Sequence, residues 1–182
     1  MRNGMNYARF MDSSLAPLVV ARSTRPGSRD HGEQHWKAVA WAGLGLARQV
    51  EGCDSELVLL FALLHDTQRF NEQRDPQHGL RAAQFALELS SEGVLTLDDE
   101  RLGVLVDACT RHDKGYVSDD PTTGACWDAD RLNLWRVGIT PEARLLSTSP
   151  AREPELIDEA RLFHGLSYSW DDLFESFAQL AI

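Results

Sequence analysis

A chain of 182 residues that is 43% hydrophobic and 25% charged has the composition of a globular protein with one well-buried core. The net charge of -10, without a stripe of lysine and arginine, argues against a protein that binds duplex nucleic acid through its phosphates. Three widely spaced cysteines without a CxxC pair argue against a disulfide framework or a cysteine zinc site. No apolar run is long enough to span a membrane or to form a secretory leader, so we expect a cytoplasmic protein without a membrane partner.

Most of the chain shows the spacing of amphipathic or buried helices. Apolar periodicity and capping residues predict helices over about 14–22, 32–50, 55–66, 76–89, 97–111, 125–137 and 153–163, a short one after Thr140-Pro141, and a last one after Ser169. Asp54, Asp75 and Thr96 are expected caps, because a side-chain oxygen at a helix start accepts hydrogen bonds from free backbone amides. A loop of about a dozen residues, 113–124, interrupts the pattern. Since no strand-like alternation occurs, the predicted fold class is all-α.

The stretch LVLLFALLHD, residues 57–66, is the one around which the rest of the chain is organised. Eight apolar residues in a row suit a helix that is buried on all sides, and His65 and Asp66 follow directly. A buried carboxylate without a partner is strongly unfavourable, so a metal ion is a natural partner for this pair. The alternative is a helix end that reaches solvent, with His65 interacting with the helix dipole.

Four further polar residues lie on helical stripes that are otherwise apolar. They are His35, His78, His112 and Asp130. Any one of them could be a core histidine or a helix cap, but five helices that each direct a histidine or an aspartate inward indicate a shared site. Imidazole and carboxylate groups suit Mn, Fe, Ni, Zn, Co or Mg, and the absence of thiolates argues against a purely structural zinc site. One divalent ion or two are therefore the expected cofactors.

The order of these residues resembles that of the HD-domain metal-dependent phosphohydrolases, whose pattern is H…HD…D. HWKAV around His35 and ALLHDTQR around His65 and Asp66 are similar to the first two elements of the family. DADRL around Asp130 is similar to its ADRL-like third element. The resemblance covers about residues 31–148. It implies a single-domain orthogonal helical bundle of the HD type over residues 1–182, with the C-terminal helices packed on the motif-bearing core.

The resemblance implies that one divalent ion is held by His35, His65, Asp66 and Asp130. A bound ion lowers the pKa of water and polarises a phosphoryl oxygen, which are the two requirements of phosphate hydrolysis. Asp66 is also the expected catalytic carboxylate, because it could bridge two ions or orient the attacking water. The family pattern selects Asp130 over Asp128, whereas helical periodicity alone leaves both aspartates open.

A second ion is implied by some HD hydrolases, including the small bis-nucleoside tetraphosphate hydrolases, which use two additional histidines. His78 and His112 have the corresponding order in this chain, with His78 in the first turn of its predicted helix and His112 in the last turn of another. Both could therefore reach a site beyond the packed stripes. The alternative is that they are core histidines without an ion.

Basic and aromatic residues near these motifs are candidates for contacts with a substrate. Arg69 and Arg131 are expected to bind phosphate and to act in catalysis, because a planar guanidinium matches phosphate oxygens. His31 precedes His35 by four residues and could contact substrate at the rim of the site. Lys114 and Tyr116 belong to the loop 113–124, which could close over a substrate with Tyr116 stacked on a base. A solvated position is the alternative for each of these five residues.

The function we expect is a metal-dependent phosphohydrolase: a phosphomonoesterase, a phosphodiesterase or a nucleotide pyrophosphohydrolase. Its substrate would be a nucleotide or another small phosphorylated metabolite, which the loops would select. The first alternative is a mixed-valent di-iron oxygenase, because a related branch of the superfamily uses the same set H, HD, H, H, D. The second is a non-catalytic ligand-binding module of the same fold, which would be expected to lack a ligand residue. A homodimer is a further expectation, because aromatic residues lie near the C-terminus.

Overall fold

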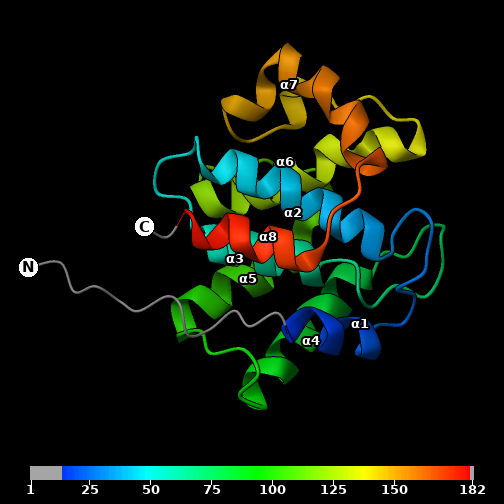
Figure 1. The fold of residues 1–182 in the computed structure, drawn as a ribbon, viewed down its shortest axis with the longest axis vertical. Coiled ribbons are helices and arrows are strands. Elements are labelled where there is room, and N and C mark those ends of the chain that lie inside the picture. Colours follow the sequence, from blue (N-terminus) through cyan, green and yellow to red (C-terminus); the bar gives the residue numbers. More distant parts are fainter. Residues whose placement is uncertain (1–13, 181–182) are drawn as a thin grey trace, which may run out of the picture.

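The computed structural model describes residues 14–180, and within that range the chain consists of helices and turns, without a strand (Figure 1). The predicted all-α class is therefore confirmed. The α-helices are α1 (Leu15–Arg22), α2 (Glu33–Ala47), α3 (Ser55–Leu64), α4 (His78–Ser91), α5 (Asp99–Arg111), α6 (Pro121–Leu132), α7 (Pro154–Glu159) and α8 (Trp170–Ala178). Short 3-10 helices lie at η2 (His112–Lys114), η3 (Asn133–Val137), η4 (Ala143–Leu145), η5 (Pro150–Arg152) and η6 (Ala160–Gly165).

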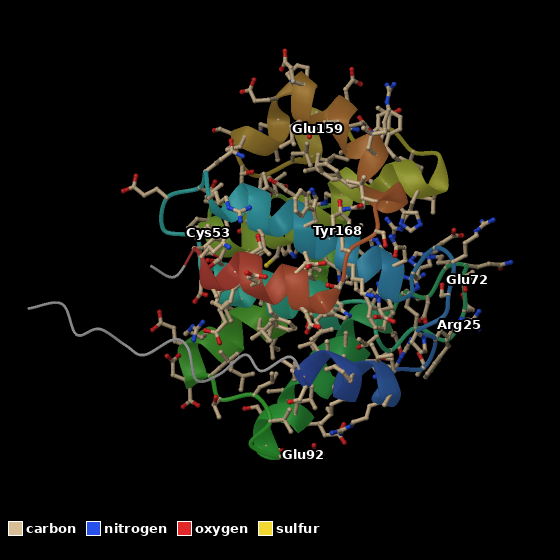
Figure 2. All side chains as sticks on the ribbon, viewed as in Figure 1. Arg25, Cys53, Glu72, Glu92, Glu159 and Tyr168 are labelled. Atoms are coloured by element: carbon tan, nitrogen blue, oxygen red, sulfur yellow. The ribbon has the colours of Figure 1, made fainter. Side chains whose placement is uncertain are left out.

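Among the described helices, none has both the length and the apolar character that crossing a bilayer requires. The prediction that no secretory leader is present concerns residues 1–13, which lie outside the described range. Charged side chains project outward from the bundle, as Glu92 and Glu159 do in Figure 2. The apolar side chains of α1 to α6 and α8 instead form one contiguous hydrophobic cluster.

Helix α3 is the central element of this cluster, and all of its residues after Ser55 are buried. Helices α2, α5 and α6 pack against it, and α8 crosses in front of it in the view of Figure 1. Because neighbours cover every side, the apolar run needs no polar face, and each fully buried leucine or phenylalanine contributes about 1.5–3 kcal/mol. The predicted cap is confirmed, since the Asp54 carboxylate accepts hydrogen bonds from the amides of Glu56 and Leu57.

The C-terminal helix α8 packs on α2 and α3 through one aromatic face. Trp170, Phe174 and Phe177 are buried on that face, as their helical spacing predicts. The helix begins with a capping box, in which the side chains of Ser169 and Asp172 each accept a hydrogen bond from the other residue's backbone amide. The residues of α8 therefore cover one side of the central helix.

The predicted start of α4 is wrong, because its expected cap bonds elsewhere. The helix begins at His78, and Asp75 is not its cap. The Asp75 carboxylate instead accepts hydrogen bonds from the amide of Phe70 and from the guanidinium of Arg81. These bonds fold the segment between α3 and α4 back on itself and fix the position from which His78 begins its helix.

Two other expected boundaries are also wrong. Helix α5 takes Asp98 as its cap in place of Thr96, with the Asp98 carboxylate accepting a hydrogen bond from a backbone amide of the first turn. Helix α6 begins at Pro121, because Asp120 caps it and proline is tolerated in the first turn. The expected loop 113–124 is therefore divided between η2, a shorter connection over 115–120, and the first turn of α6.

Arg101 of α5 links that helix to the beginning of α3 through hydrogen bonds. Its guanidinium donates hydrogen bonds to both carboxylate oxygens of Asp54 and, at 2.7 Å, to Oε2 of Glu56. Glu56 is buried within the otherwise apolar helix α3. The buried carboxylate is tolerated there because the guanidinium neutralises it.

We expect Arg101→Met to lower the free energy of unfolding by about 2–4 kcal/mol, because the buried Glu56 carboxylate loses its partner. Chemical denaturation followed by circular dichroism measures this loss. The double variant Arg101→Met/Glu56→Met should recover at least about 1 kcal/mol of it, since the one carboxylate that loses Arg101 is then Asp54, which is 31% exposed and reaches water. A double variant no more stable than the single one would contradict the argument.

Candidate metal centre

Six polar residues from five parts of the chain meet in one cluster, which we call the His/Asp cluster. Its members are His35 of α2, His65 and Asp66 directly after α3, His78 at the start of α4, His112 directly after α5, and Asp130 of α6. The side chains of the first five are buried, and that of Asp130 is 14% exposed. The cluster therefore lies where the ends of the central helices converge.

One half of the cluster joins α2, α3 and α6. The Nε2 atoms of His35 and His65 lie 3.2 Å apart. Asp130 Oδ1 lies 3.2 Å from Nε2 of His35 and 3.8 Å from Nε2 of His65. Asp66 Oδ2 lies 3.8 Å from each of the same two nitrogens. Four side chains thus direct one atom each toward a common point.

The other half of the cluster joins α4 and the end of α5. The Nε2 atoms of His78 and His112 lie 2.8 Å apart, and Asp66 Oδ1 lies 3.2 Å from the first and 3.7 Å from the second. Asp66 therefore presents Oδ2 to one pair of imidazoles and Oδ1 to the other. Because its two oxygens serve different pairs, this carboxylate is the shared element of the cluster.

Three of the four imidazoles are oriented by the backbone that directly precedes them in the chain. The Nδ1 atoms of His65, His78 and His112 lie 3.1, 2.5 and 2.7 Å from the carbonyl oxygen three residues earlier. A carbonyl only accepts hydrogen bonds, so Nδ1 carries the proton and Nε2 has a lone pair. The fourth ring differs, because Nδ1 of His35 is buried and has no hydrogen-bond partner among residues 14–180.

These tautomers make a cation the natural occupant of the cluster. The facing lone pairs of His78 and His112 repel each other at 2.8 Å unless a proton or a metal ion lies between them. Ligands bonded at about 2.0–2.2 Å to one ion lie about 3–3.5 Å from each other, which is close to the separations in both halves of the cluster. Two groups of three, His35–His65–Asp66 and Asp66–His78–His112, bring one ligand atom each within 4.8 Å of the others.

The electrostatics give most of these groups the protonation state that a metal requires. Burial lowers the pKa of His35 to about 3 and that of His65 to about 4, so both imidazoles are neutral near pH 7. Burial opposes ionisation of Asp66 and Asp130, but the surrounding imidazoles outweigh it and hold the pKa of both carboxyls well below its usual value. Burial lowers the pKa of His112, but the Asp66 carboxylate outweighs it and raises that pKa above its ordinary value. A proton therefore competes with a metal ion in this half of the cluster.

The two aspartates of DADRL, Asp128 and Asp130, have different contacts in the structure. Asp128 is fully buried and accepts hydrogen bonds from the amides of Ser147 and Thr148 and from the Thr148 hydroxyl. It therefore ties the segment after η4 to helix α6. Asp130 lies instead on the His35 side of the helix, where its Oδ1 contacts the cluster.

A cavity of about 320 Å³ opens beside the His/Asp cluster. Asp66, Asp130, His78 and His112 line its floor, and Leu134, Ile139, Leu145 and Leu146 contribute apolar walls. Arg69, Arg131 and Arg136 also line it, as do the acidic residues Asp113 and Glu142. A cavity of this size, with apolar walls and a few convergent polar groups, has the features of a small-molecule site.

Two of the arginines at this cavity have unused donors. Arg69 places Nη1 3.5 Å from Asp66 Oδ1 and donates Nη2 to the Gln73 carbonyl, while its buried Nε has no hydrogen-bond partner in the described chain. Arg131 donates Nη1 to the Leu145 carbonyl, and its buried Nη2 likewise lacks a partner within residues 14–180. Because buried donors are rarely left unpaired, these two atoms are open to an acceptor that residues 14–180 do not supply.

Arg136 is a site residue that the sequence analysis missed. Its side chain is 4% exposed, its Nε donates to the Asp30 carbonyl, and its Nη1 lies 4.0 Å from Asp130 Oδ1. The residue belongs to the 3-10 helix η3, where α-helical spacing from Asp130 no longer applies. The only available signal was an arginine within the apolar stretch LWRV.

The remaining predicted substrate residues divide into two groups. His31 lines the cavity, and its Nδ1 lies 3.0 Å from Asp66 Oδ2. Lys114 lines a neighbouring pocket that shares Arg69, His78 and Asp113 with this cavity, and its ammonium donates to the Pro76 carbonyl and pairs with Asp113. Tyr116 is 56% exposed and lies off the cavity lining. The structure therefore brings His31 to the cluster, places Lys114 beside the cavity and leaves Tyr116 on the surface.

Comparisons of the chain with protein-family models, with curated proteins and with solved structures find no match. The function must therefore be argued from the geometry of the cluster and its cavity.

The close approach of α4 and α5 at Gly79 allows a direct test of the second half of the cluster. A Cβ at Gly79 would collide with the Cys109 carbonyl and press on the His112 ring. We expect Gly79→Ala to separate His78 from His112 and to lower the affinity for one ion about 10- to 100-fold while the other stays bound. Equilibrium metal titration of the purified protein measures the affinity for each ion. Gly103→Ala on α5 is the control, since a Cβ there meets nothing within 4 Å.

Proposed function

We propose that this protein is a metal-dependent phosphohydrolase that acts on a nucleotide or another small phosphorylated metabolite. The observation that carries the proposal is the convergence of two pairs of imidazoles on opposite oxygens of Asp66, beside a cavity lined by three arginines. Imidazole and carboxylate groups in this arrangement suit divalent ions of the first transition series or magnesium. The arginines suit the anionic groups of a phosphate ester.

In this proposal each half of the His/Asp cluster holds one ion. His35, His65, Asp66 and Asp130 would hold the first, and Asp66, His78 and His112 the second. When bound, such ions supply a water of lowered pKa and positive charge for the phosphoryl oxygens. The protein holds the ligands in a buried, rigid cluster, so little reorganisation is needed on binding.

The arginines would bind and orient the phosphate. Arg69 lies on the Asp66 Oδ1 side of the cluster, and Arg136 lies on the Asp130 side. A phosphate between them would accept charge-assisted hydrogen bonds at both ends of the metal centre, and Arg131, which also lines the cavity, would supply a third guanidinium. Burial strengthens these interactions, because the guanidinium groups are screened little by water. The apolar walls would contact the organic part of the substrate.

The resemblance to the HD-domain phosphohydrolases is part of this proposal. The chain order of the cluster, His35, then His65 and Asp66, then Asp130, is the H…HD…D order of that family. Supporting it, all four residues contribute atoms to the same half of the cluster. No ligand residue is missing, which speaks against a non-catalytic module of the same fold.

The same six residues would also suit a mixed-valent di-iron oxygenase, and this is the second candidate. The observation in its favour is that both halves of the cluster are complete. The cavity favours the hydrolase, because three guanidinium groups at its lining suit a phosphate better than an uncharged carbon chain. The bound metal and the requirement for dioxygen distinguish the two activities.

We expect metal-stripped protein to be inactive and to regain phosphate release with at least one of Mn, Fe, Ni, Zn, Co or Mg. A panel of nucleoside monophosphates, nucleoside polyphosphates, cyclic nucleotides and sugar phosphates defines the substrate. Asp66→Ala should reduce turnover by at least about a thousandfold, because both halves of the cluster lose a ligand. Activity of Asp66→Ala equal to wild type, or turnover that needs iron and dioxygen without phosphate release, would refute the proposal.

Arg131→Lys should lower kcat/KM for the phosphorylated substrate about 10- to 100-fold, since lysine keeps the charge but loses the planar pair of donors. Steady-state kinetics measures the change, and metal content should match that of wild type. The matched control is Arg161→Lys, at an arginine that is more than half exposed and pairs with Asp158 on α7, away from the cavity lining. A loss of similar size in the control would show a general effect of the substitution.

A further inference from the structure

His31 makes a direct contact with the carboxylate that the two imidazole pairs share. Its Nδ1 lies 3.0 Å from Asp66 Oδ2, the oxygen that faces His35 and His65. Arg136 Nη2 lies 3.4 Å from the same nitrogen. A guanidinium only donates hydrogen bonds and a carboxylate only accepts them, so Nδ1 can serve one of the two. The shorter contact, with the charged oxygen, assigns the proton to Nδ1 and makes His31 a donor to Asp66.

Two hydrogen bonds to the backbone of His31 fix its position. Its amide donates to the Ser28 hydroxyl at 3.0 Å, and its carbonyl accepts a hydrogen bond from Trp36 Nε1 at 2.8 Å. The imidazole packs edge-on against the ring of His35, and its side chain is only 15% exposed. A solvated histidine at a helix start would not need this set of contacts.

The segment that carries His31 is itself fastened to the segment that carries Asp66. Thr24 donates its backbone amide to the Thr67 carbonyl, directly after Asp66, at 3.0 Å. Arg25 and Glu72 form an ion pair of 2.9 Å at the same edge of the molecule, where Figure 2 labels both. The two segments therefore keep a fixed relation, and the contact between His31 and Asp66 is part of that arrangement.

Each oxygen of Asp66 has one donor outside the two imidazole pairs. His31 contacts Oδ2, and Arg69 Nη1 lies 3.5 Å from Oδ1. The two donors come from different sides and differ in size, so they distinguish the oxygens and oppose rotation of the carboxylate about its Cβ–Cγ bond. Apart from His31, the polar side chains of residues 14–180 nearest to Oδ2 are His35 and His65, whose Nε2 atoms lie 3.8 Å away and would share an ion with it.

The geometry points to His31 as a positioning residue of the metal centre: it holds Asp66 Oδ2 toward His35 and His65 and thereby leaves Oδ1 for His78 and His112. This inference rests on the proposed metal centre, but it does not depend on which reaction the centre performs. It also replaces the expectation that His31 contacts substrate. Carboxylates that bind metals are commonly held by such outer hydrogen bonds, and loss of one weakens metal binding about 10- to 100-fold.

Three substitutions separate this role from its alternatives. His31→Asn keeps an N–H donor on the atom that corresponds to Nδ1, whereas His31→Ala removes the donor. His31→Gln carries its donor one bond further out and provides the same contrast should the alanine variant fail to fold. Arg29→Ala is the control for the segment, because that side chain is 89% exposed and pairs only with the neighbouring Asp30 among the described residues.

The experiment is a titration of the metal-stripped full chain with Mn²⁺, with free metal followed by a chromophoric chelator and coupling between two bound ions followed by electron paramagnetic resonance. We expect His31→Ala to weaken binding of at least one ion about 10- to 100-fold and to reduce the coupled signal, with His31→Asn within about threefold of wild type. His31→Gln should resemble the alanine variant, and Arg29→Ala should resemble wild type. Thermal unfolding of the metal-free proteins checks that the fold is kept.

Wild-type affinity in His31→Ala would overturn the inference, and so would an asparagine variant as weak as the alanine variant, because a retained donor would then be of no use. The inference and the proposed function fail separately. Two ions bound with the expected order of variants, but no phosphate release from any substrate, would refute the hydrolase and leave the role of His31 intact. Phosphate release, combined with metal binding that does not depend on residue 31, would refute the role of His31 and leave the hydrolase intact.

Discussion

The structure depends on one carboxylate, that of Asp66, held between two pairs of imidazoles at the end of an apolar helix. A buried negative charge is costly unless it is surrounded by donors or cations. Here His31, His78 and Arg69 contact it directly, and the imidazoles keep it ionised. Helices α2, α4, α5 and α6, which all pack against α3, each place one polar group at this point, either from the helix itself or from the residue directly after it, so the packing of these four helices assembles the site.

The rings of the cluster are oriented largely by local structure. In three of the four, Nδ1 donates to the carbonyl three residues earlier. For His65 and His112 this carbonyl lies at a helix end, where carbonyls lack an intrahelical partner, and for His78 it is the Asp75 carbonyl, which also accepts the His78 amide. This contact directs Nε2 outward from its own segment without help from the rest of the fold. Tertiary packing then needs only to bring the ends of the segments together. For α4 and α5 this close approach is possible because Gly79 has no side chain.

The charge of the cavity is mixed, whereas the whole chain is strongly acidic. The protein has a net charge of -10, and the cavity beside the cluster is lined by three arginines and four carboxylates, two of which, Asp66 and Asp130, belong to the cluster. Local charge matters more than net charge for a buried site, because groups within the cavity interact through a medium of low dielectric constant. An acidic surface does not fit a polyanion that would cover it, whereas the three arginines, together with cations held by Asp66 and Asp130, would suit a small anionic ligand.

The sequence by itself determined the all-α class, the burial of α3 with its Asp54 cap, the capping box at Ser169, and the four histidines and Asp66 of the cluster. Helical periodicity fixes which face of a helix a residue occupies, and that suffices for these features. Only the tertiary structure decided that Asp130 rather than Asp128 contacts His35, that His31 contacts Asp66, and that Lys114 and Tyr116 lie off the cavity. Periodicity does not state which atoms of a neighbouring element lie opposite a given face. It also fails at a change to 3-10 geometry, which is why Arg136 was found only in the structure.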